Sequence, residues 1–290
     1  MLRHLKHIRP PRGARVDPRL KTITVLHLLN HTGGWDRSRS GDPANMSVPV
    51  ARQLGVPLPL SADQLISFMM GVPLDFDPGT KMVYSNIGYV ILGQIVEKVS
   101  GQSYEDYVRK NVLEPAGVRK AHLRSSPKYL PGEALCYLAG SSTPLPHLDL
   151  PMIKAAGGWC VSPVDMVRLL TALDGSRGRP LLQEKTRQLM LTPPPPPLQV
   201  GAKGIFPGLG FESAYVGKDG YAYFQDGSWY GMRTFMKRSV HGINWVIAFN
   251  ASMQPDLIDR KVAANAVQEL KATVERIKDY PKVDYFGEYR

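Results

Sequence analysis

The 290-residue chain is 43% hydrophobic and 21% charged, which suits one large globular domain or two lobes, and no apolar run of about 18 residues predicts a membrane span. About half of the net charge of +11 lies in residues 1–22, and the other basic residues are scattered among acids. Without a zinc-finger, KH or RRM signature, this charge predicts a solubilising surface and no nucleic-acid partner. The two cysteines, Cys136 and Cys160, make neither a disulfide framework nor a metal site, so we expect no metal and no cofactor.

The chain begins with a basic segment and then enters helical sequence. Residues 1–21 lack the apolar stretch of a signal peptide, and the sequence leaves the compartment unassigned. Residues 22–31 indicate an extended segment that turns into a short helix. Residues 61–71 predict a second helix, capped by Ser61 and ended by Gly71.

The strongest helix signal lies over residues 87–99. Its apolar residues recur at spacings of three and four, and Gly101 is the expected C-terminal stop. Another helix should follow, because Ser103 and Asp106 form a capping box with Asp in place of Glu. It is predicted to run to about Leu113.

The middle of the chain is poorer in regular structure. Residues 120–155 are rich in Pro, Ser and Gly and predict loops. A helix is predicted over residues 162–173, with Ser162 as its cap and Pro163 at its first position. The prolines at 193–197 predict a stiff surface connector in preference to an SH3 ligand.

Strand signals dominate the last third. Short aromatic or β-branched runs, separated by Gly, Asp and Asn turns, predict an antiparallel meander over residues 208–252. Residues 255–280 predict a closing amphipathic helix. We therefore expect an α+β fold in a single domain, 1–290, with a mainly helical lobe over 22–190 beside an antiparallel sheet plus C-terminal helix over 200–290.

A polar triplet, Tyr84-Ser85-Asn86, precedes the best helix. Tyr84 and Asn86 lie two apart in an extended turn, so their side chains can point the same way. A phenol and a carboxamide that face one cleft can act as a proton acceptor and as a clamp on a substrate amide. On its own, the Y-x-N pattern is a very weak signal, because chance and helix capping explain most of its occurrences.

The segments around this triplet follow one another in the order found in a known family. They are DPRLKTITVLHLLNHTGGW at 17–35, FDPGTKMVYSNIGYVILGQIVEKVSGQSYEDYV at 76–108, VLEPAGV at 112–118, AAGGWCVSPVDMVRLL at 155–170, and the strand pair within 208–235. Together they resemble the serine β-lactamase and penicillin-binding-protein superfamily, in the branch of class C β-lactamases, D-alanyl-D-alanine carboxypeptidases and β-lactamase-like esterases. The resemblance implies a β-lactamase/transpeptidase-like fold, here N-terminally incomplete.

The resemblance also implies a catalytic apparatus. A serine in an S-x-x-K motif would be acylated, Tyr84 would be the general base, and Asn86 would contact the substrate amide. A strand wall would bind the substrate, and a backbone N–H in it would complete an oxyanion hole. Four consecutive residues match this wall: Gln225, Asp226, Gly227 and Ser228.

The chain departs from the family pattern in two places. Gln225 stands where Lys or His is expected, so a cation that would lower the tyrosine pKa and hold a substrate carboxylate is missing on that side. This favours neutral esters over β-lactams and peptidoglycan peptides. The family's S-x-x-K precedes the segment at 17–35, whereas Ser125-Ser126-Pro127-Lys128 follows it and contains a helix-breaking proline, so we do not expect Ser125 to be the nucleophile.

Other candidates are weaker. His27 and His31 are predicted to pack and to form a turn, and neither is expected to be catalytic. Trp159 and Trp229 either line the cleft or are ordinary half-buried aromatics. The chain contains no G-x-S-x-G elbow and no His, Cys and Asp set at metal-ligand spacing.

Three hypotheses remain. In the first, the chain is the larger part of a serine hydrolase that cleaves a small-molecule ester, amide or peptide through an acyl-enzyme, and the nucleophile segment is missing from it. In the second, it is a catalytically inactive pseudo-hydrolase or binding module. In the third, it is a truncated product that does not fold stably, because absent strands and a central helix would leave apolar surface uncovered. The oligomeric state is open.

Overall fold

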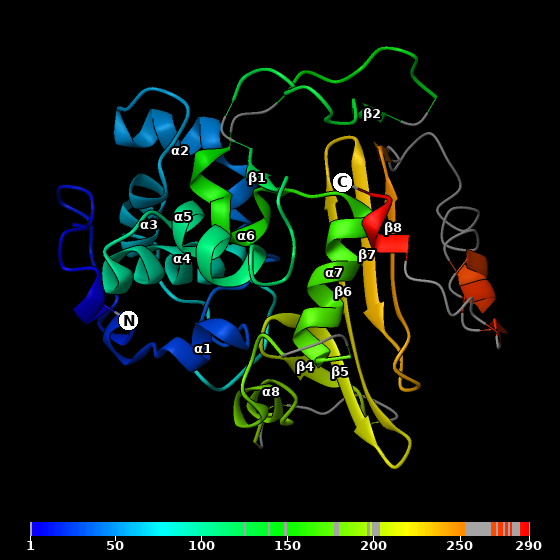
Figure 1. The fold of residues 1–290 in the computed structure, drawn as a ribbon. Helices are drawn as coiled ribbons and strands as arrows, with labels where there is room; N and C mark the ends of the chain where they lie inside the picture. The colour runs from blue at the N-terminus through cyan, green and yellow to red at the C-terminus, as the bar shows by residue number, and fades with distance from the viewer. Residues whose placement is uncertain are drawn as a thin grey trace.

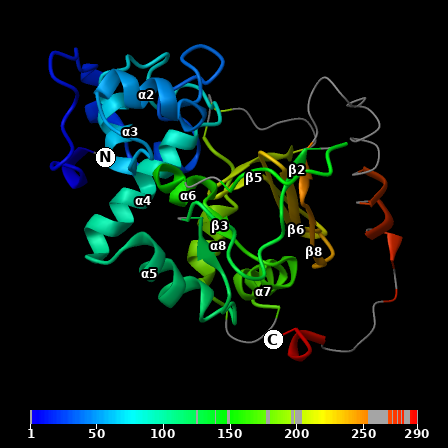
Figure 2. The same cartoon turned by 90° about the horizontal axis from the view of Figure 1, so that it is seen from above.

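Two lobes lie side by side in the computed structural model, one helical and one built on a sheet (Figures 1 and 2). The structure describes residues 2–124, 126–138, 140–147, 150–176, 180–195, 198, 204–252, 268–270, 272–274, 276–277, 279 and 285–289. Within these ranges, no helix is both long enough and apolar enough to cross a membrane.

The helical lobe is assembled around one long helix, α4. Its helices are α1 (Val25–Leu29), α2 (Ser47–Leu54), α3 (Ala62–Met70), α4 (Asn86–Ser100), α5 (Tyr104–Val108) and α6 (Lys154–Gly157). Shorter helical turns are η1 (Leu2–His4), η2 (Pro18–Thr22), η3 (Pro43–Asn45), η5 (Pro151–Ile153) and the π-turn η4 (Arg109–Leu113). Ile87, Val90 and Ile91 of α4 are fully buried in one apolar cluster with Leu65 of α3 and Leu28 of α1.

The helix ends are as the sequence predicts. Ser61 accepts a hydrogen bond from the Gln64 N–H at the start of α3. Gly101 ends α4 with a left-handed φ of 69°, a conformation that glycine adopts without the steric cost of a side chain. Ser103 caps α5 through the Asp106 N–H, and η4 continues the helical path to Leu113.

The predicted meander is confirmed as a five-stranded antiparallel sheet in the order β4-β5-β6-β7-β8. Its strands are β4 (Phe206–Gly208), β5 (Phe211–Gly217), β6 (Gly220–Trp229), β7 (Met232–Arg238) and β8 (Asn244–Phe249). Tyr230 and Gly231 make the two-residue turn between β6 and β7, where Trp229 pairs with Met232. Two short pairs lie outside this sheet: β1 (His122–Leu123) runs antiparallel to β3 (Trp159–Cys160), and β2 (Tyr137–Leu138) runs parallel to β9 (Ala251–Ser252).

One face of the sheet packs against α7 (Pro163–Asp174), whose Ser162 cap and initial Pro163 match the prediction. Leu170 of α7 is fully buried in a second apolar cluster, together with Phe206, Phe211, Ala214 and Tyr223 from the sheet. The helix α8 (Glu184–Met190) follows α7 along the chain. Most of the predicted C-terminal helix lies outside the described residues, although 268–270 and 272–274 are helical.

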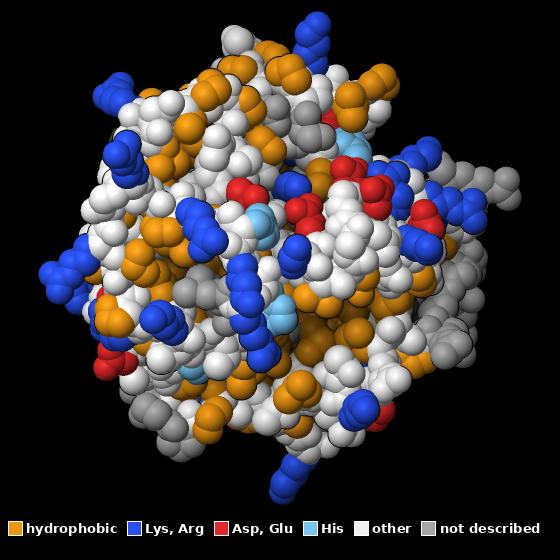
Figure 3. All heavy atoms as spheres, turned by 90° about the vertical axis from the view of Figure 1, so that its left-hand side faces the viewer, with side chains coloured by type: hydrophobic (Ala, Val, Ile, Leu, Met, Phe, Trp, Pro, Cys, Tyr) orange, Lys and Arg blue, Asp and Glu red, His pale blue; other side chains and the backbone are white. Residues whose placement is uncertain are grey.

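The α+β fold class is therefore confirmed, and the expectation of a single domain stays a prediction. Figure 3 shows the outer face of the helical lobe, where separate Lys and Arg side chains are mixed with hydrophobic ones and several basic side chains lie near the middle. The absence of a nucleic-acid partner also stays a prediction.

Candidate functional site

Tyr84 and Asn86 lie together at the first turn of α4. The Tyr84 hydroxyl donates a hydrogen bond to Oδ1 of Asn86 over 3.1 Å, so the two side chains share one direction as expected. Asn86 is the first residue of the helix, whereas Tyr84 still belongs to the extended segment before it. The tyrosine side chain is 38% exposed and can be reached from solvent.

Hydrogen bonds at both its oxygen and its nitrogen orient the Asn86 side-chain amide. Its Nδ2 donates to Oδ2 of Asp42 over 2.6 Å, while its Oδ1 accepts from Tyr84. Asp42 is itself fixed, because it caps η3 by accepting the Ala44 N–H. Sequence reasoning missed Asp42, since nothing in the local pattern around it points to a partner on α4.

His31 contacts the triplet through a hydrogen bond and through ring packing. Its Nδ1 accepts the Ser85 N–H over 3.1 Å, and its ring centroid lies 4.7 Å from that of Tyr84 and 5.1 Å from that of Tyr89. Burial lowers the pKa of His31 to about 4, so the ring is neutral at neutral pH. His27 caps α1 with Thr24. The predicted packing and turn role is confirmed for His31, whose φ is 56°, whereas His27 lies within α1 as a capping residue.

The electrostatic surroundings of Tyr84 favour a protonated phenol. Burial raises its pKa, the Asp42 carboxylate raises it further, and Asp226 and Glu212 act in the same direction. Arg37 opposes them: its Cζ lies 5.3 Å from the tyrosine ring centroid, and its charge lowers the pKa. The outcome is a raised pKa, which makes the hydroxyl a proton donor at neutral pH.

The four predicted wall residues lie at the end of β6. Oε1 of Gln225 accepts the Glu212 N–H over 2.8 Å, and its Nε2 donates to the Asp226 carbonyl over 2.8 Å, so this amide is engaged within the sheet. Asp226 pairs with Arg233 over 2.6 Å. Gly227 and Ser228 are exposed.

Strand β6 approaches the helical lobe at its last residue. Trp229 packs against the apolar cluster of that lobe, and the Asp226 carboxylate is close enough to act on the Tyr84 pKa. Open space surrounds the position where a side chain at Gly227 would project. The structure thus brings Tyr84 and Asn86 into contact and sets the end of β6 within electrostatic reach of them.

The structure does not bring the remaining candidates that it describes into contact with Tyr84 or Asn86. Ser125 is not among the described residues, and residues 126–130 form no helix, in agreement with the argument from Pro127. Trp159 donates weakly from Nε1 to the Tyr104 hydroxyl over 3.4 Å and packs beside Leu113, as an ordinary half-buried aromatic does.

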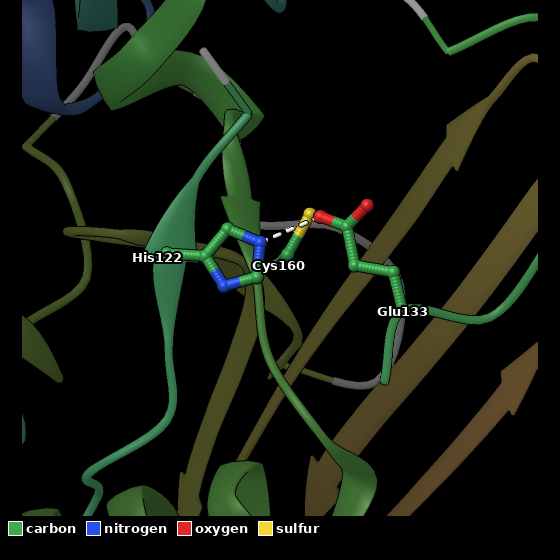
Figure 4. A group of neighbouring side chains, drawn as sticks. All are labelled: His122, Glu133 and Cys160. Carbon is green, nitrogen blue, oxygen red and sulfur yellow. Dashed lines mark hydrogen bonds and ion pairs between the residues drawn. The ribbon is translucent and has the colours of Figure 1, made fainter. Parts of the chain in front are cut away.

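Another group of side chains could hold a metal ion. It consists of His122, Glu133 and Cys160, whose ligand atoms are within 4.8 Å of one another (Figure 4). The three residues are far apart in sequence, so spacing alone gave no sign of them.

Comparison with known proteins agrees with the fold. The family model described as Beta-lactamase matches residues 6–268. A putative penicillin-binding protein of Bacillus subtilis (strain 168) is 29% identical over 208 residues, which cover 71% of this chain and 45% of that protein. A putative D-alanyl-D-alanine carboxypeptidase of Escherichia coli (strain K12) is 32% identical over 97 residues, or 33% of this chain and 21% of that protein. The matches thus span less than half the length of these relatives.

Solved structures share the same architecture. A penicillin-binding protein from Bacillus halodurans superposes with a TM-score of 0.66 at 25% identity, covering 87% of this chain and 74% of that one. A D-amino acid amidase from Ochrobactrum anthropi SV3, complexed with L-phenylalanine, gives a TM-score of 0.67 at 21% identity, covering 89% and 73%. At that identity, the second likeness shows the fold alone.

Proposed function

The chain belongs to the beta-lactamase family, and we propose that it forms part of a serine hydrolase that cleaves a neutral ester or amide through an acyl-enzyme. The observation that carries this proposal is the Tyr84–Asn86 pair, which is hydrogen-bonded, held by His31 and Asp42, and accessible to solvent beside the end of β6. Such a pair offers a proton-transfer group and an amide contact within one turn of backbone.

The proposed roles follow from the geometry. Asn86 would exchange its bond to Tyr84 for one to the substrate amide while Asp42 keeps its other end fixed. The backbone at Gly227 and Ser228 would receive the substrate carbonyl, because no side chain at Gly227 blocks the approach. Tyr84 would give its proton to the leaving group, and the proton of the attacking serine would pass to the lysine of the S-x-x-K motif that the family resemblance implies. A base role for Tyr84 would need a second cation beside the hydroxyl in addition to Arg37.

The charges at the end of β6 support a neutral substrate. Gln225 carries no charge and its amide is engaged, and the charge of Asp226 is balanced by Arg233. A substrate carboxylate would therefore find no cation at the position of Gln225. Binding a carboxylate there would remove its charge from water without a compensating partner. An uncharged ester or amide avoids this cost.

A second candidate is a binding module without turnover. Two observations favour it: the Gln225 amide is engaged within the sheet, and the raised pKa of Tyr84 opposes a base role. Such a module would hold an amide ligand through Asn86 and the end of β6, and it would release that ligand unchanged.

Kinetics separate the two candidates. The longest natural polypeptide that contains these residues is assayed with a p-nitrophenyl ester, a D-amino acid p-nitroanilide and a chromogenic cephalosporin. We expect the neutral ester to be the best substrate, and Tyr84→Phe to lower kcat/KM by about 10²- to 10⁴-fold, the usual worth of a positioned acid–base group. Tyr107→Phe, a tyrosine of α5 away from the site, should match the wild type.

Covalent labelling completes the test. A fluorophosphonate probe followed by peptide mass spectrometry should identify one acylated serine. Absence of both turnover and labelling would refute the hydrolase proposal, and ligand binding that is lost in Asn86→Ala would then favour the binding module. Turnover that Tyr84→Phe leaves unchanged would refute the role of the phenol.

A further inference from the structure

The His122, Glu133 and Cys160 side chains converge from three separate segments (Figure 4). His122 lies in β1 and Cys160 in β3, where the two residues are directly paired across the antiparallel ladder. Glu133 reaches them from the loop that follows β1. Nε2 of His122 lies 2.5 Å from Oε1 of Glu133, and the sulfur of Cys160 is within 4.8 Å of both ligand atoms.

Contacts with residues outside the group orient its members. Nδ1 of His122 faces the Lys120 carbonyl at 3.4 Å, and Oε2 of Glu133 accepts the Leu130 N–H over 2.8 Å. In metal sites, the ligating histidine commonly gives its other ring N–H to a carbonyl, and the ligating carboxylate is itself hydrogen-bonded. Both features are present here.

Without a metal ion, the Glu133 carboxylate is the shared partner within the group. It forms side-chain hydrogen bonds with both His122, over 2.5 Å, and Cys160. A divalent cation that displaced the two protons of these contacts would find Nε2, a carboxylate oxygen and Sγ as its ligands.

Neighbouring groups help to define the ligand set. Nε2 of His147 lies 3.3 Å from Oε2 of Glu133, but it also accepts from Nε of Arg124 over 3.0 Å, and its Nδ1 is engaged by the Ser126 carbonyl. This buried histidine thus already has partners on both nitrogens. His122, Glu133 and Cys160 therefore remain as the three candidate metal ligands. The His122 side chain is 27% exposed, which leaves room for a solvent molecule as the fourth ligand.

We propose that His122, Glu133 and Cys160 bind one divalent metal ion of the zinc type through Nε2, a carboxylate oxygen and Sγ, with solvent completing a tetrahedron. Zinc takes nitrogen, oxygen and sulfur ligands at about 2.0 to 2.3 Å, which needs ligand atoms roughly 3.3 to 3.8 Å apart, so small side-chain movements suffice. The carboxylate and the thiolate together balance the charge of the ion.

The binding reaction releases a proton. Burial and the Glu133 carboxylate raise the pKa of Cys160 to about 11, so the free group is a thiol, and a metal–sulfur bond forms as the S–H bond gives its proton to solvent. The ion would join the loop at Glu133 to the β1–β3 pair. Because β3 follows α6 directly, the metal would stabilise the connection between the helical lobe and α7.

Cobalt(II) provides the test, because its bond to a thiolate gives a charge-transfer absorption band. The chelator-treated, fully reduced protein is titrated with Co²⁺ and then with Zn²⁺. We expect the band to saturate at one equivalent, about one proton to be released per metal, and Zn²⁺ to abolish the band. Cys160→Ser should lose the band, and Glu133→Gln and His122→Gln should weaken metal binding by about tenfold or more.

The controls decide the assignment. Cys136→Ser, which removes the other cysteine, and His241→Gln, in the turn between β7 and β8, should bind as the wild type does. The metal-free variants are compared by circular dichroism, and Glu133→Gln serves as the second probe if Cys160→Ser does not fold. A reduced wild type without a thiolate band, or a band that survives Cys160→Ser, overturns the proposal, as does equal loss in Cys136→Ser.

Discussion

His31 shows how one buried side chain can fix the position of the candidate site. It lies 9% exposed beneath Tyr84, it adopts a left-handed φ of 56°, and its unprotonated Nδ1 accepts the Ser85 N–H. A protonated ring would lose that hydrogen bond and bury a charge. The geometry of Tyr84 therefore depends on a neutral imidazole.

A pH dependence of stability follows. The pKa of His31 is about 4 in the folded protein, against an unperturbed value of 6.5, so between these values the unfolded chain binds a proton that the native state does not. The contribution of the neutral His31 to the free energy of unfolding is complete above pH 6.5. It is lost as the pH falls toward 4, by about 3 kcal/mol at most.

Urea unfolding at several pH values checks this contribution. His31→Asn keeps a residue that tolerates the left-handed backbone but does not titrate in this range. We expect the free energy of unfolding of this variant to fall less steeply between pH 6.5 and 4 than that of the wild type. His241→Asn, at an exposed turn, should keep the wild-type slope, and parallel curves for His31→Asn and the wild type would contradict the argument.

At the scale of elements, α4 and α6 approach each other more closely than side chains normally allow. A Cβ added at Gly93 of α4 would lie 2.5 Å from Cβ of Ala155 in α6. That contact is possible only because position 93 is a glycine. Since α6 leads directly into β3, this approach helps to place the segment that carries Cys160.

At this contact glycine should be more favourable than alanine, although alanine is normally the better helix former. Gly93→Ala gains about 1 kcal/mol in helix propensity, but overpacking the contact costs about 1 to 3 kcal/mol, so we expect a net destabilisation of up to about 2 kcal/mol. Adding Ala155→Gly should restore much of the stability, and urea unfolding of both single variants and the double variant measures the coupling. Additive single effects would show that the two helices do not meet at this point.

At the scale of the whole molecule, the site lies where two differently built lobes approach each other. The helical lobe holds Asn86 at the start of α4 and Tyr84 just before it. The sheet lobe holds residues 225–228 on β6, and Trp229 packs across to the helical cluster. Each lobe has its own apolar cluster, one around α4 and one between α7 and the sheet. A ligand that contacts both lobes would bridge these two cores.

The arrangement of elements was largely predictable because its signals are local. Ser61, Ser162 and Gly101 mark helix ends through bonds and angles within a few residues of themselves. Alternating aromatic and β-branched residues likewise identify the meander before any tertiary contact is known. The Y-x-N triplet was found in the same way, with its meaning supplied by the family resemblance.

The partners of the site were not predictable, because they come from distant positions. Asp42 and His31 meet the triplet across 44 and 54 residues, and Arg37 reaches the tyrosine ring from a loop. No periodicity or cap encodes such contacts. From the sequence we expected no cation at the position of Gln225. The sequence did not indicate that Arg37, from another segment, lies close to the tyrosine ring.

The structure of a complex tests the central claim, that Tyr84, Asn86 and the end of β6 surround a single ligand. The natural polypeptide is crystallised with a neutral phosphonate ester, which imitates the tetrahedral stage of acyl transfer. We expect its phosphoryl oxygen at the backbone of Gly227 and Ser228, and the leaving-group side within hydrogen-bond reach of the Tyr84 hydroxyl. A phosphonate bound elsewhere, or a Tyr84 hydroxyl turned away from it with Asn86, would contradict the account.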